Sequence, residues 1–508
     1  MRFTSLIVEL VRARPRLMFW IVVLLQAALW LIVPSVFYES PPGDVATVLA
    51  FGREYQLGYR SGPPIAYWLG DVAFRLAGNS MFGVYLLAQI CFVVTFWALF
   101  ALSRAIVGAQ QAILAILLTC TIAAFSFPGV EYGPSVLACP VWALMLLHAW
   151  QIVGQGRRNA WFALSIETGI LLLTTSAAIP LLLVLIVFAL ATARGRAALA
   201  STDPVFAAIV VLAIVLPYLT WVLRTDSATA ALLPSFADVY ERLQGWGELL
   251  LGMAFAVWGV ALLVIFNSGR FNRKPEEAPV IYRPSVDPLA RIFVYTFALA
   301  PPVILSAVAA LYGRDRVAGG DGAALLLAGL AVIVTAGDLI YLRRQHILRS
   351  VWLIVMAAPV VFVIGSVFIQ PWIGATEART SLPANAIGKF FGENFERRVG
   401  RPLASVAGDP QISTLIGIGA SARPHVMFDA APQLTPWLTP ARFSETGGIV
   451  VWRASDTAGT PPADIARRFP GLVPEVPRTF DRIVKGRQSP LRIGWAVVRP
   501  QGALQSPR

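Results

Sequence analysis

The feature that most constrains this chain is a series of long apolar runs separated by short polar breaks. A helix of roughly 20 apolar residues spans the hydrocarbon core of a bilayer. Clear runs of this length lie between residue 1 and about residue 372, at 17–37, 82–103, 110–127, 134–153, 204–223, 247–267, 291–312, 323–342 and 350–370. The pattern therefore predicts a polytopic, all-α membrane domain over residues 1–372.

A further apolar stretch at 161–192 affects the number of spans. It is too long for one straight helix and is interrupted by Thr174, Thr175, Ser176 and Pro180, so we expect two short helices there. The total is then about 11 transmembrane helices by this count of runs. The first run is too long for a signal peptide and no small-residue cleavage site follows it, so we interpret it as a helix.

Basic residues indicate the orientation of these spans. With the N-terminus inside, the inner segments hold 17 Arg and Lys residues and the outer segments 7. Cytoplasmic loops carry an excess of Lys and Arg. The count predicts a cytoplasmic N-terminus and, with eleven spans, a C-terminus on the outer side.

Composition excludes a soluble cytosolic enzyme, a disordered chain and a fibrous repeat. Apolar residues make up 57% of the chain and charged residues only 14%, against about a quarter in a soluble domain. Three cysteines exclude a disulfide scaffold and a cysteine-based zinc module. The net charge of +13 is explained by the basic inner segments and by a basic outer domain. The outer domain lacks the alternating aromatic and basic residues that are typical of proteins that bind single-stranded nucleic acid. No nucleic-acid partner is expected.

From about residue 375 the composition becomes more polar, and Pro, Arg, Asp and Glu are frequent. Residues 375–508 are predicted to form a small α/β domain on the outer side. Thr439-Pro440 is typical of a helix start, with an N-cap followed by proline. The other predicted elements are helices at 385–400 and 462–469 and strands at 403–407, 425–428, 449–452 and 493–498.

The first outer loop, about 38–80, is the largest polar segment near the membrane. Its helical spacing begins at Val45 and runs to Gln56, so Asp44 lies at or just before a helix N-terminus. One interpretation is an N-cap, in which the carboxylate accepts free backbone N–H groups. The other is a general base held at the membrane surface, where partial burial can adjust its pKa. The spacing leaves both open.

The loop also carries a motif. Asp44 is followed by Gly58-Tyr59 and then Pro63-Pro64. In the second outer loop Glu131-Tyr132 leads to Pro140-Val141-Trp142-Ala143-Leu144, and the outer domain contains Arg423-Pro424-His425. With these motifs the chain resembles the GT-C type membrane glycosyltransferases of family 39, which include protein O-mannosyltransferases, the lipid A aminoarabinose transferase and rhizobial galacturonosyltransferases.

The resemblance implies a reaction as well as a fold. A sugar would pass, with inversion, from a polyprenyl-phosphate donor to a lipid, glycan or protein acceptor at the outer face of a bacterial inner membrane. The loop aspartate, here Asp44, would be the base. No nucleotide-binding domain is needed, and no glycine-rich fingerprint occurs. No cofactor is certain, although a divalent metal remains possible.

The chain departs from the family pattern at several positions. Val45 and Thr47 stand where a second acidic residue is expected, and Ser61-Gly62 replaces a Lys or His that precedes Pro-Pro in the family. Arg53 or Arg60 is a candidate to bind the donor phosphate instead, because arginine binds phosphate well. The alternative is that these side chains only extend to lipid headgroups.

The remaining candidates lie in other outer loops. Glu131 is a second carboxylate that could orient the acceptor or a metal, or a solvated residue at a helix start. Tyr59 and Tyr132 are candidate acceptor or loop contacts. Arg224 and Arg242 flank an outer loop that could close over the donor phosphate.

Two alternatives to an active transferase stay open: a catalytically silent relative in glycan or lipid export, and a transporter. A transporter is expected to show matching halves with broken helices, and the sequence shows no such repeat. Its spans would also carry several deep charges, whereas only Glu167 lies deep.

Overall fold

The fold comes from a computed structural model. It describes residues 3–127, 131–225, 239–268, 280–342, 345–374, 379–429, 431, 434–482, 484, 486–487 and 490–501. The chain forms two compact units. The first comprises Met1–Val33, Leu57–Ala66 and Tyr85–Val361, and the second Pro34–Gln56, Tyr67–Val84 and Phe362–Arg508. Much of the first outer loop therefore belongs to the unit that contains the C-terminal residues, while the boundary predicted near residue 372 stays a prediction.

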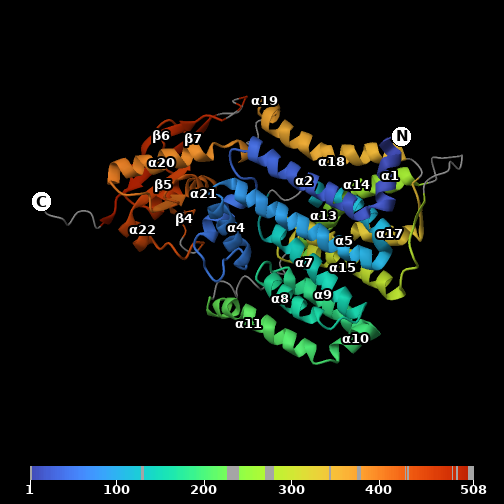
Figure 1. The fold of residues 1–508 in the computed structure, drawn as a ribbon. Helices are drawn as coiled ribbons and strands as arrows, with labels where there is room; N and C mark the ends of the chain where they lie inside the picture. The colour runs from blue at the N-terminus through green and yellow to red at the C-terminus, as the bar shows by residue number, and fades with distance from the viewer. Residues whose placement is uncertain are drawn as a thin grey trace. The chain divides into compact units, whose positions relative to one another are not determined.

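The first unit is a bundle of apolar helices (Figure 1). Within it α8 packs against both α7 and α11, and α15 packs against α9, α13 and α17. The elements that lie in this unit wholly or in large part are α1 (Phe3–Ala13), α2 (Pro15–Phe37), α5 (Met81–Cys120), α6 (Ala123–Ser126), α7 (Pro134–Val153), α8 (Ala160–Leu172), α9 (Ala178–Ala191), α10 (Ala193–Leu199), α11 (Asp203–Arg224), α13 (Val239–Ala256), α14 (Trp258–Asn267), β1 (Val280–Tyr282), α15 (Pro288–Leu311), α16 (Gly320–Ala324), α17 (Ala328–Ala336), β2 (Leu339–Tyr341) and α18 (Gln345–Phe368). The predicted polytopic helical architecture is confirmed.

The apolar runs correspond to helices, but not always one to one. Among the described residues, six helices are long and apolar enough to span a membrane, or up to eight if two bent pairs each count as one span. The pairs are α9 with α10, bent by 105°, and α13 with α14, bent by 47°. Helix α5 holds the predicted run 82–103 and most of the run 110–127, and it bends at Gly108, whose φ of 76° is outside the helical region and favours glycine. The count of eleven spans stays a prediction.

The one deep acidic side chain noted in the sequence has a partner. Nδ1 of His148 in α7 lies 2.8 Å from a carboxylate oxygen of Glu167 in α8. Both side chains are largely buried, and a buried charged group is tolerated when it is paired. Glu167 therefore joins two packed helices of the bundle.

Another polar contact fixes the end of α17. Arg283, which is 1% exposed, places Nε 3.0 Å from Asp338 and donates Nη1 and Nη2 to the carbonyls of Ile333 and Val334. The last carbonyls of a helix have no partner within the helix. The Arg283 guanidinium therefore caps α17 and holds the two-stranded β1–β2 sheet against it.

We expect Arg283→Met to destabilise the bundle. The substitution leaves the Ile333 and Val334 carbonyls unsatisfied, at a cost of about 1–3 kcal/mol for each buried group. The thermal unfolding midpoint of the detergent-purified protein measures this, and Arg158→Met, at an exposed arginine in the same unit, is the matched control. Equal midpoints for the two variants would show that Arg283 has no capping role.

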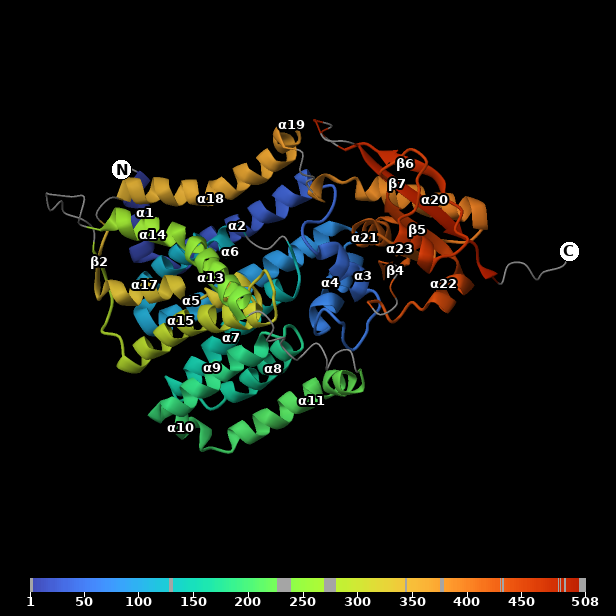
Figure 2. The same cartoon turned by 180° about the vertical axis from the view of Figure 1, so that it is seen from behind.

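The second unit is built on a five-stranded sheet of order β4-β3-β5-β7-β6 (Figure 2). Strands β3 (Ser405–Gly408), β4 (His425–Phe428) and β5 (Gly448–Arg453) are parallel, while β7 (Leu491–Val498) and β6 (Glu475–Phe480) run antiparallel to their neighbours. The unit also contains α3 (Val45–Gly52), α4 (Ile65–Leu76), α19 (Gln370–Ile373), η2 (Arg379–Ser381), α20 (Ala384–Val399), α21 (Pro410–Gly419), α22 (Pro440–Thr446) and α23 (Ala463–Arg468). The predicted small α/β region is confirmed.

Alternation along the strands gives this sheet two apolar faces. Ile449 and Val451 pack with α20 and α21 on one face, and Val450 and Trp452 pack with α22 and α23 on the other. Successive side chains of a strand point to opposite faces. The sheet is therefore covered by helices on both sides.

Candidate functional site

Asp44 occupies the N-cap position of α3, but its side chain makes no capping hydrogen bond. The backbone explains this, because φ and ψ are −100° and 12°, whereas a capping residue typically has extended backbone angles. The side chain is exposed. Of the two interpretations from the sequence, capping is not observed, and the role of Asp44 as a base stays a prediction.

Helix α3 itself is firmly packed. Val45 and Leu49 are fully buried, and the helix lies against α21. The Phe51 ring lies 4.8 Å from the ring of Phe428 and 5.0 Å from that of Trp437, measured between centroids. Val45, where the family pattern has an acid, is thus an apolar side chain buried in the packing of this helix.

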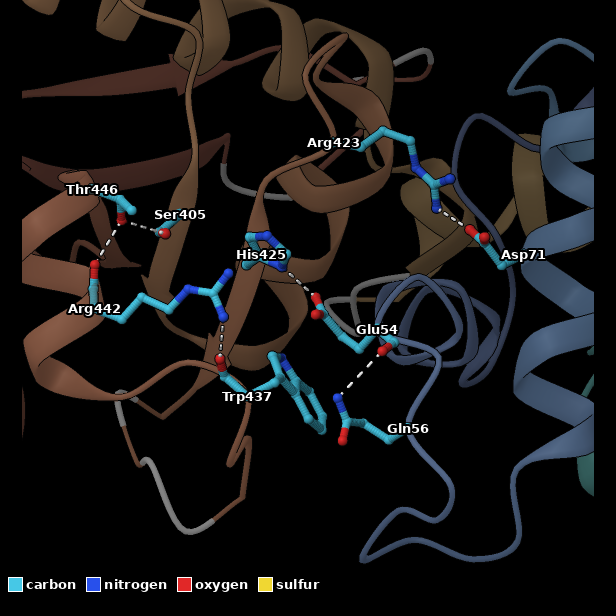
Figure 3. A network of polar contacts seen from close by, with 9 residues as sticks. All are labelled: Glu54, Gln56, Asp71, Ser405, Arg423, His425, Trp437, Arg442 and Thr446. Carbon is cyan, nitrogen blue, oxygen red and sulfur yellow. Dashed lines mark hydrogen bonds and ion pairs between the residues drawn. The ribbon is translucent and has the colours of Figure 1, made fainter. Parts of the chain in front are cut away.

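The far end of α3 carries charge. Arg53 is the C-cap residue, and burial is the largest cause that lowers the pKa of its guanidinium. The next residue, Glu54, places a carboxylate oxygen 2.7 Å from Nδ1 of His425 (Figure 3). Arg53 lies nine positions after Asp44, about 13 Å along a helix axis at 1.5 Å per residue. The two predicted site residues therefore mark opposite ends of one short helix.

A buried carboxylate lies beside this end of α3. Asp71 in α4 is 0% exposed and faces Nη2 of Arg423 at 2.6 Å and Nε of Arg75 at 2.7 Å. The Tyr55 hydroxyl donates to it at 2.8 Å. Burial is the largest cause that raises the pKa of the Tyr55 hydroxyl, and the hydrogen bond to Asp71 raises it further. Figure 3 shows that the Asp71 and Glu54 contacts both reach the C-terminal part of the unit.

Arg423 is unusual in both backbone and side chain. Its φ is 48°, a region uncommon for residues other than glycine. It is 8% exposed, and its guanidinium lies 4.9 Å from the centre of the Phe74 ring. Strained backbone of this kind persists only when the surroundings fix it. The paired, stacked guanidinium therefore fixes the segment before β4 against α4.

Glycine is required where α3 meets α4. A Cβ atom on Gly52 would lie 2.1 Å from the carbonyl oxygen of Tyr67 and 3.1 Å from the Asp71 side chain. Only the absence of a side chain allows this approach. Gly52, Arg53 and Asp71 therefore belong to one closely packed junction.

The Gly-Tyr and Pro-Pro motif lies in the first unit. Tyr59 is 3% exposed and exchanges two backbone hydrogen bonds of 3.0 Å with Gly62. Ser61-Gly62 thus lies in a closed turn, and Arg60 within it is exposed. An exposed guanidinium on a tight turn is available to a phosphate, so the predicted role of Arg60 stays open as a prediction.

The second-loop residues differ from one another. Glu131 is 45% exposed, and its carboxylate lies 3.8 Å from Nη1 of Arg316. An exposed pair of this length contributes little stability. Tyr132 is 1% exposed and forms part of the core. The structure brings Glu131 near Arg316 and places the Tyr132 ring inside the bundle.

Arg224 and Arg242 flank residues 226–238, which lie outside the described residues. Arg224 is exposed in the last turn of α11. Nη1 of Arg242 donates to the carbonyl of Ala310 at 3.4 Å, near the end of α15. From Val239 onward the predicted loop belongs to α13, and the phosphate-binding roles of both arginines stay predictions.

A metal site was left possible by the sequence. Within the described ranges, no three His, Cys, Asp or Glu side chains gather in a group that would hold an ion.

Comparisons with known proteins agree with this architecture. Residues 61–221 match the family described as dolichyl-phosphate-mannose-protein mannosyltransferase. ArnT from Cupriavidus metallidurans bound to undecaprenyl phosphate is similar with a TM-score of 0.62 and 15% identity, over 97% of this chain and 99% of that chain. The apo state of ArnT gives a TM-score of 0.57 at the same identity and coverage. The chain has the GT-C fold.

This fold confirms the resemblance drawn from the sequence motifs. It also agrees with the polytopic membrane character predicted from the apolar runs. No curated protein sequence matches the chain with significance.

Proposed function

We propose that the protein transfers a sugar from a polyprenyl-phosphate donor to a lipid, glycan or protein acceptor at the outer face of the membrane, with Asp44 as the base. The observation that carries the proposal is an exposed, uncapped carboxylate at the start of a rigidly packed helix in a chain with the GT-C fold. The bound undecaprenyl phosphate of ArnT supports a polyprenyl-phosphate donor here. We further propose an inner-membrane location, with the N-terminus cytoplasmic and the C-terminal domain periplasmic.

The reaction is a single displacement at the anomeric carbon. Asp44 accepts the proton of an acceptor hydroxyl, and the oxygen forms a bond to the anomeric carbon. The bond from that carbon to the phosphate oxygen breaks, and its electron pair leaves with polyprenyl phosphate. One displacement inverts the configuration. A general base in such a step contributes about 10²–10⁴-fold in rate.

The leaving phosphate gains negative charge and needs cationic partners. Arg53, Arg60, Arg224 and Arg242 are the candidates, since guanidinium groups form charge-assisted hydrogen bonds to phosphate. Glu131 would orient the acceptor, and Tyr59 and Tyr132 would shape the loops around it. Arg53 is the best supported of the four arginines, because its Nη1 is buried without a hydrogen-bond partner in the described structure.

We expect Arg53→Gln to raise the KM for the donor by about tenfold, the effect of losing roughly 1.4 kcal/mol of binding. Arg53→Lys retains the charge and should recover part of the loss. Arg401→Gln removes the same charge from an exposed arginine of the same unit and is the matched control. If Arg53→Gln and Arg401→Gln have the same KM, Arg53 does not bind the donor.

The proposed function is tested by direct transfer. Purified protein in vesicles is given undecaprenyl phosphate that carries a radiolabelled sugar, together with cell-envelope lipids, glycans or proteins as acceptors. We expect label to move to one acceptor class and free undecaprenyl phosphate to appear in equal amount. Absence of transfer with a panel of donor sugars and all three acceptor classes would contradict the proposal and favour a silent relative.

A further inference from the structure

A cavity of about 670 Å³, open on one side, lies in the first unit. Its walls come from α1, α2, α5, α14, α17, β2 and α18. Pockets of several hundred Å³ are the size that holds small organic ligands. The proposed reaction gives this cavity no role, since the candidate site residues discussed above do not line it.

The lining is apolar except at one end. Val8, Leu118 and Leu353 are typical of the walls, while Asn267, Ser268, Gln345 and Arg349 gather where α14 ends and α18 begins. A large apolar cavity is a poor site for water, which needs several polar partners. The lining therefore fits a ligand that has a hydrocarbon chain and a polar end group.

The nearby chain indicates the charge of that end group. Val11 and Met18 both line the cavity, and Arg12, Arg14 and Arg16 lie between them, all exposed. Nη2 of Arg12 donates to the carbonyl of Val280 at 2.6 Å, which ties this segment to β1. Glu9 is the exposed acid on the same helix, so positive charge prevails on the described part of this segment.

We propose that this cavity is a lipid site, which holds an acyl chain of an anionic phospholipid with its headgroup at the end marked by Gln345 and Arg349. Basic pockets between transmembrane helices on the cytoplasmic side bind anionic headgroups, and the N-terminal arginines are predicted to be cytoplasmic. Burial of hydrocarbon favours the chain, at about 0.8 kcal/mol for each CH₂ group. The lipid is neither donor nor acceptor and stabilises the junction of α1, α14 and α18.

Native mass spectrometry of the full-length protein in mild detergent tests the proposal. We expect the wild type to retain one phospholipid with an anionic headgroup. Leu353→Trp and Val264→Trp fill the cavity from two different helices at side chains that are 51% and 44% exposed, so each substitution has room. Each should lower the lipid-bound fraction at least about tenfold. Leu216→Trp, on the exposed face of α11 and outside the lining, should leave it unchanged.

A second measurement tests the headgroup. Delipidated protein is incubated with vesicles of phosphatidylglycerol or of phosphatidylcholine, and Arg349→Gln should lose most of the preference for phosphatidylglycerol. Unfolding midpoints of all variants identify any that fail to fold. If one of the two cavity-filling variants fails to fold, the other one tests the proposal. Retention of lipid by a folded filling variant, absence of bound lipid in the wild type, or a bound mass equal to that of undecaprenyl phosphate would each overturn the proposal.

Discussion

We expect Asp44→Asn to lower the rate of sugar transfer by about 10²–10⁴-fold, the contribution typical of a positioned general base. Asparagine keeps the size of the side chain and its hydrogen-bonding capacity but accepts no proton at neutral pH. The Asp44 side chain is exposed and does not cap α3, so the substitution should leave the fold intact. The measurement is kcat in the vesicle assay, with the thermal unfolding midpoint as a check on folding.

Asp464→Asn is the matched control for this prediction. Asp464 is an exposed acid in the first turn of α23, in the same compact unit as Asp44. Its replacement changes the charge of the unit by the same amount and should leave kcat unchanged. Turnover by Asp44→Asn equal to that of Asp464→Asn would remove Asp44 from the mechanism while leaving the GT-C fold as it is.

The helices of the membrane region could be predicted because composition alone decides them. Each long apolar run must satisfy its backbone groups internally, and a helix does so. In the C-terminal part, the strand predicted at 425–428 matches β4, and Thr439 accepts from the Arg442 N–H at 3.2 Å as the Thr-Pro signature predicted. Short-range sequence signals were therefore sufficient to predict the elements that depend on neighbouring residues.

The elements that were missed have weaker local signals. Strand β6, Glu475–Phe480, is half polar and contains Pro477, and in a sequence both features argue against a strand. It lies at the edge of the sheet, where proline is tolerated because one side of the strand is unpaired. Helix α21 has an Asp409-Pro410 start like that of α22, and the Asp409 carboxylate accepts from the Ile412 N–H. This start was the signal available for α21.

The junction around Asp71 was missed for a different reason. Asp71 and Arg75 are four residues apart in α4, a local pairing that the sequence contains. The contact with Arg423 joins segments far apart in the chain, and one sequence does not show such pairs. The single acid of α4 was the available signal, because a buried carboxylate requires a partner.

We expect Arg423→Met to destabilise the second unit by about 3–5 kcal/mol, the cost of removing one partner from a buried ion pair. Asp71 is 0% exposed and would be left with only the outward-facing Arg75 and the Tyr55 hydroxyl as partners. Since Arg423 and the adjacent Glu54–His425 contact hold the junction below α3, the loss should also lower kcat by misplacing Asp44. Chemical unfolding of the purified protein and the vesicle assay measure the two effects.

The double variant Asp71→Leu/Arg423→Met separates a buried charge from lost packing. When both partners are replaced by apolar residues of similar volume, no buried charge remains unpaired, and such replacements are often neutral or stabilising. We therefore expect the double variant to be more stable than Arg423→Met alone, with a coupling energy within the range of about 0.5–3 kcal/mol found for residues in contact. Arg442→Met, at an exposed arginine of α22, is the control for loss of a guanidinium. Additive effects of the two single substitutions would mean that Asp71 and Arg423 do not stabilise one another, and the junction would then depend on the Phe51 and Gly52 packing.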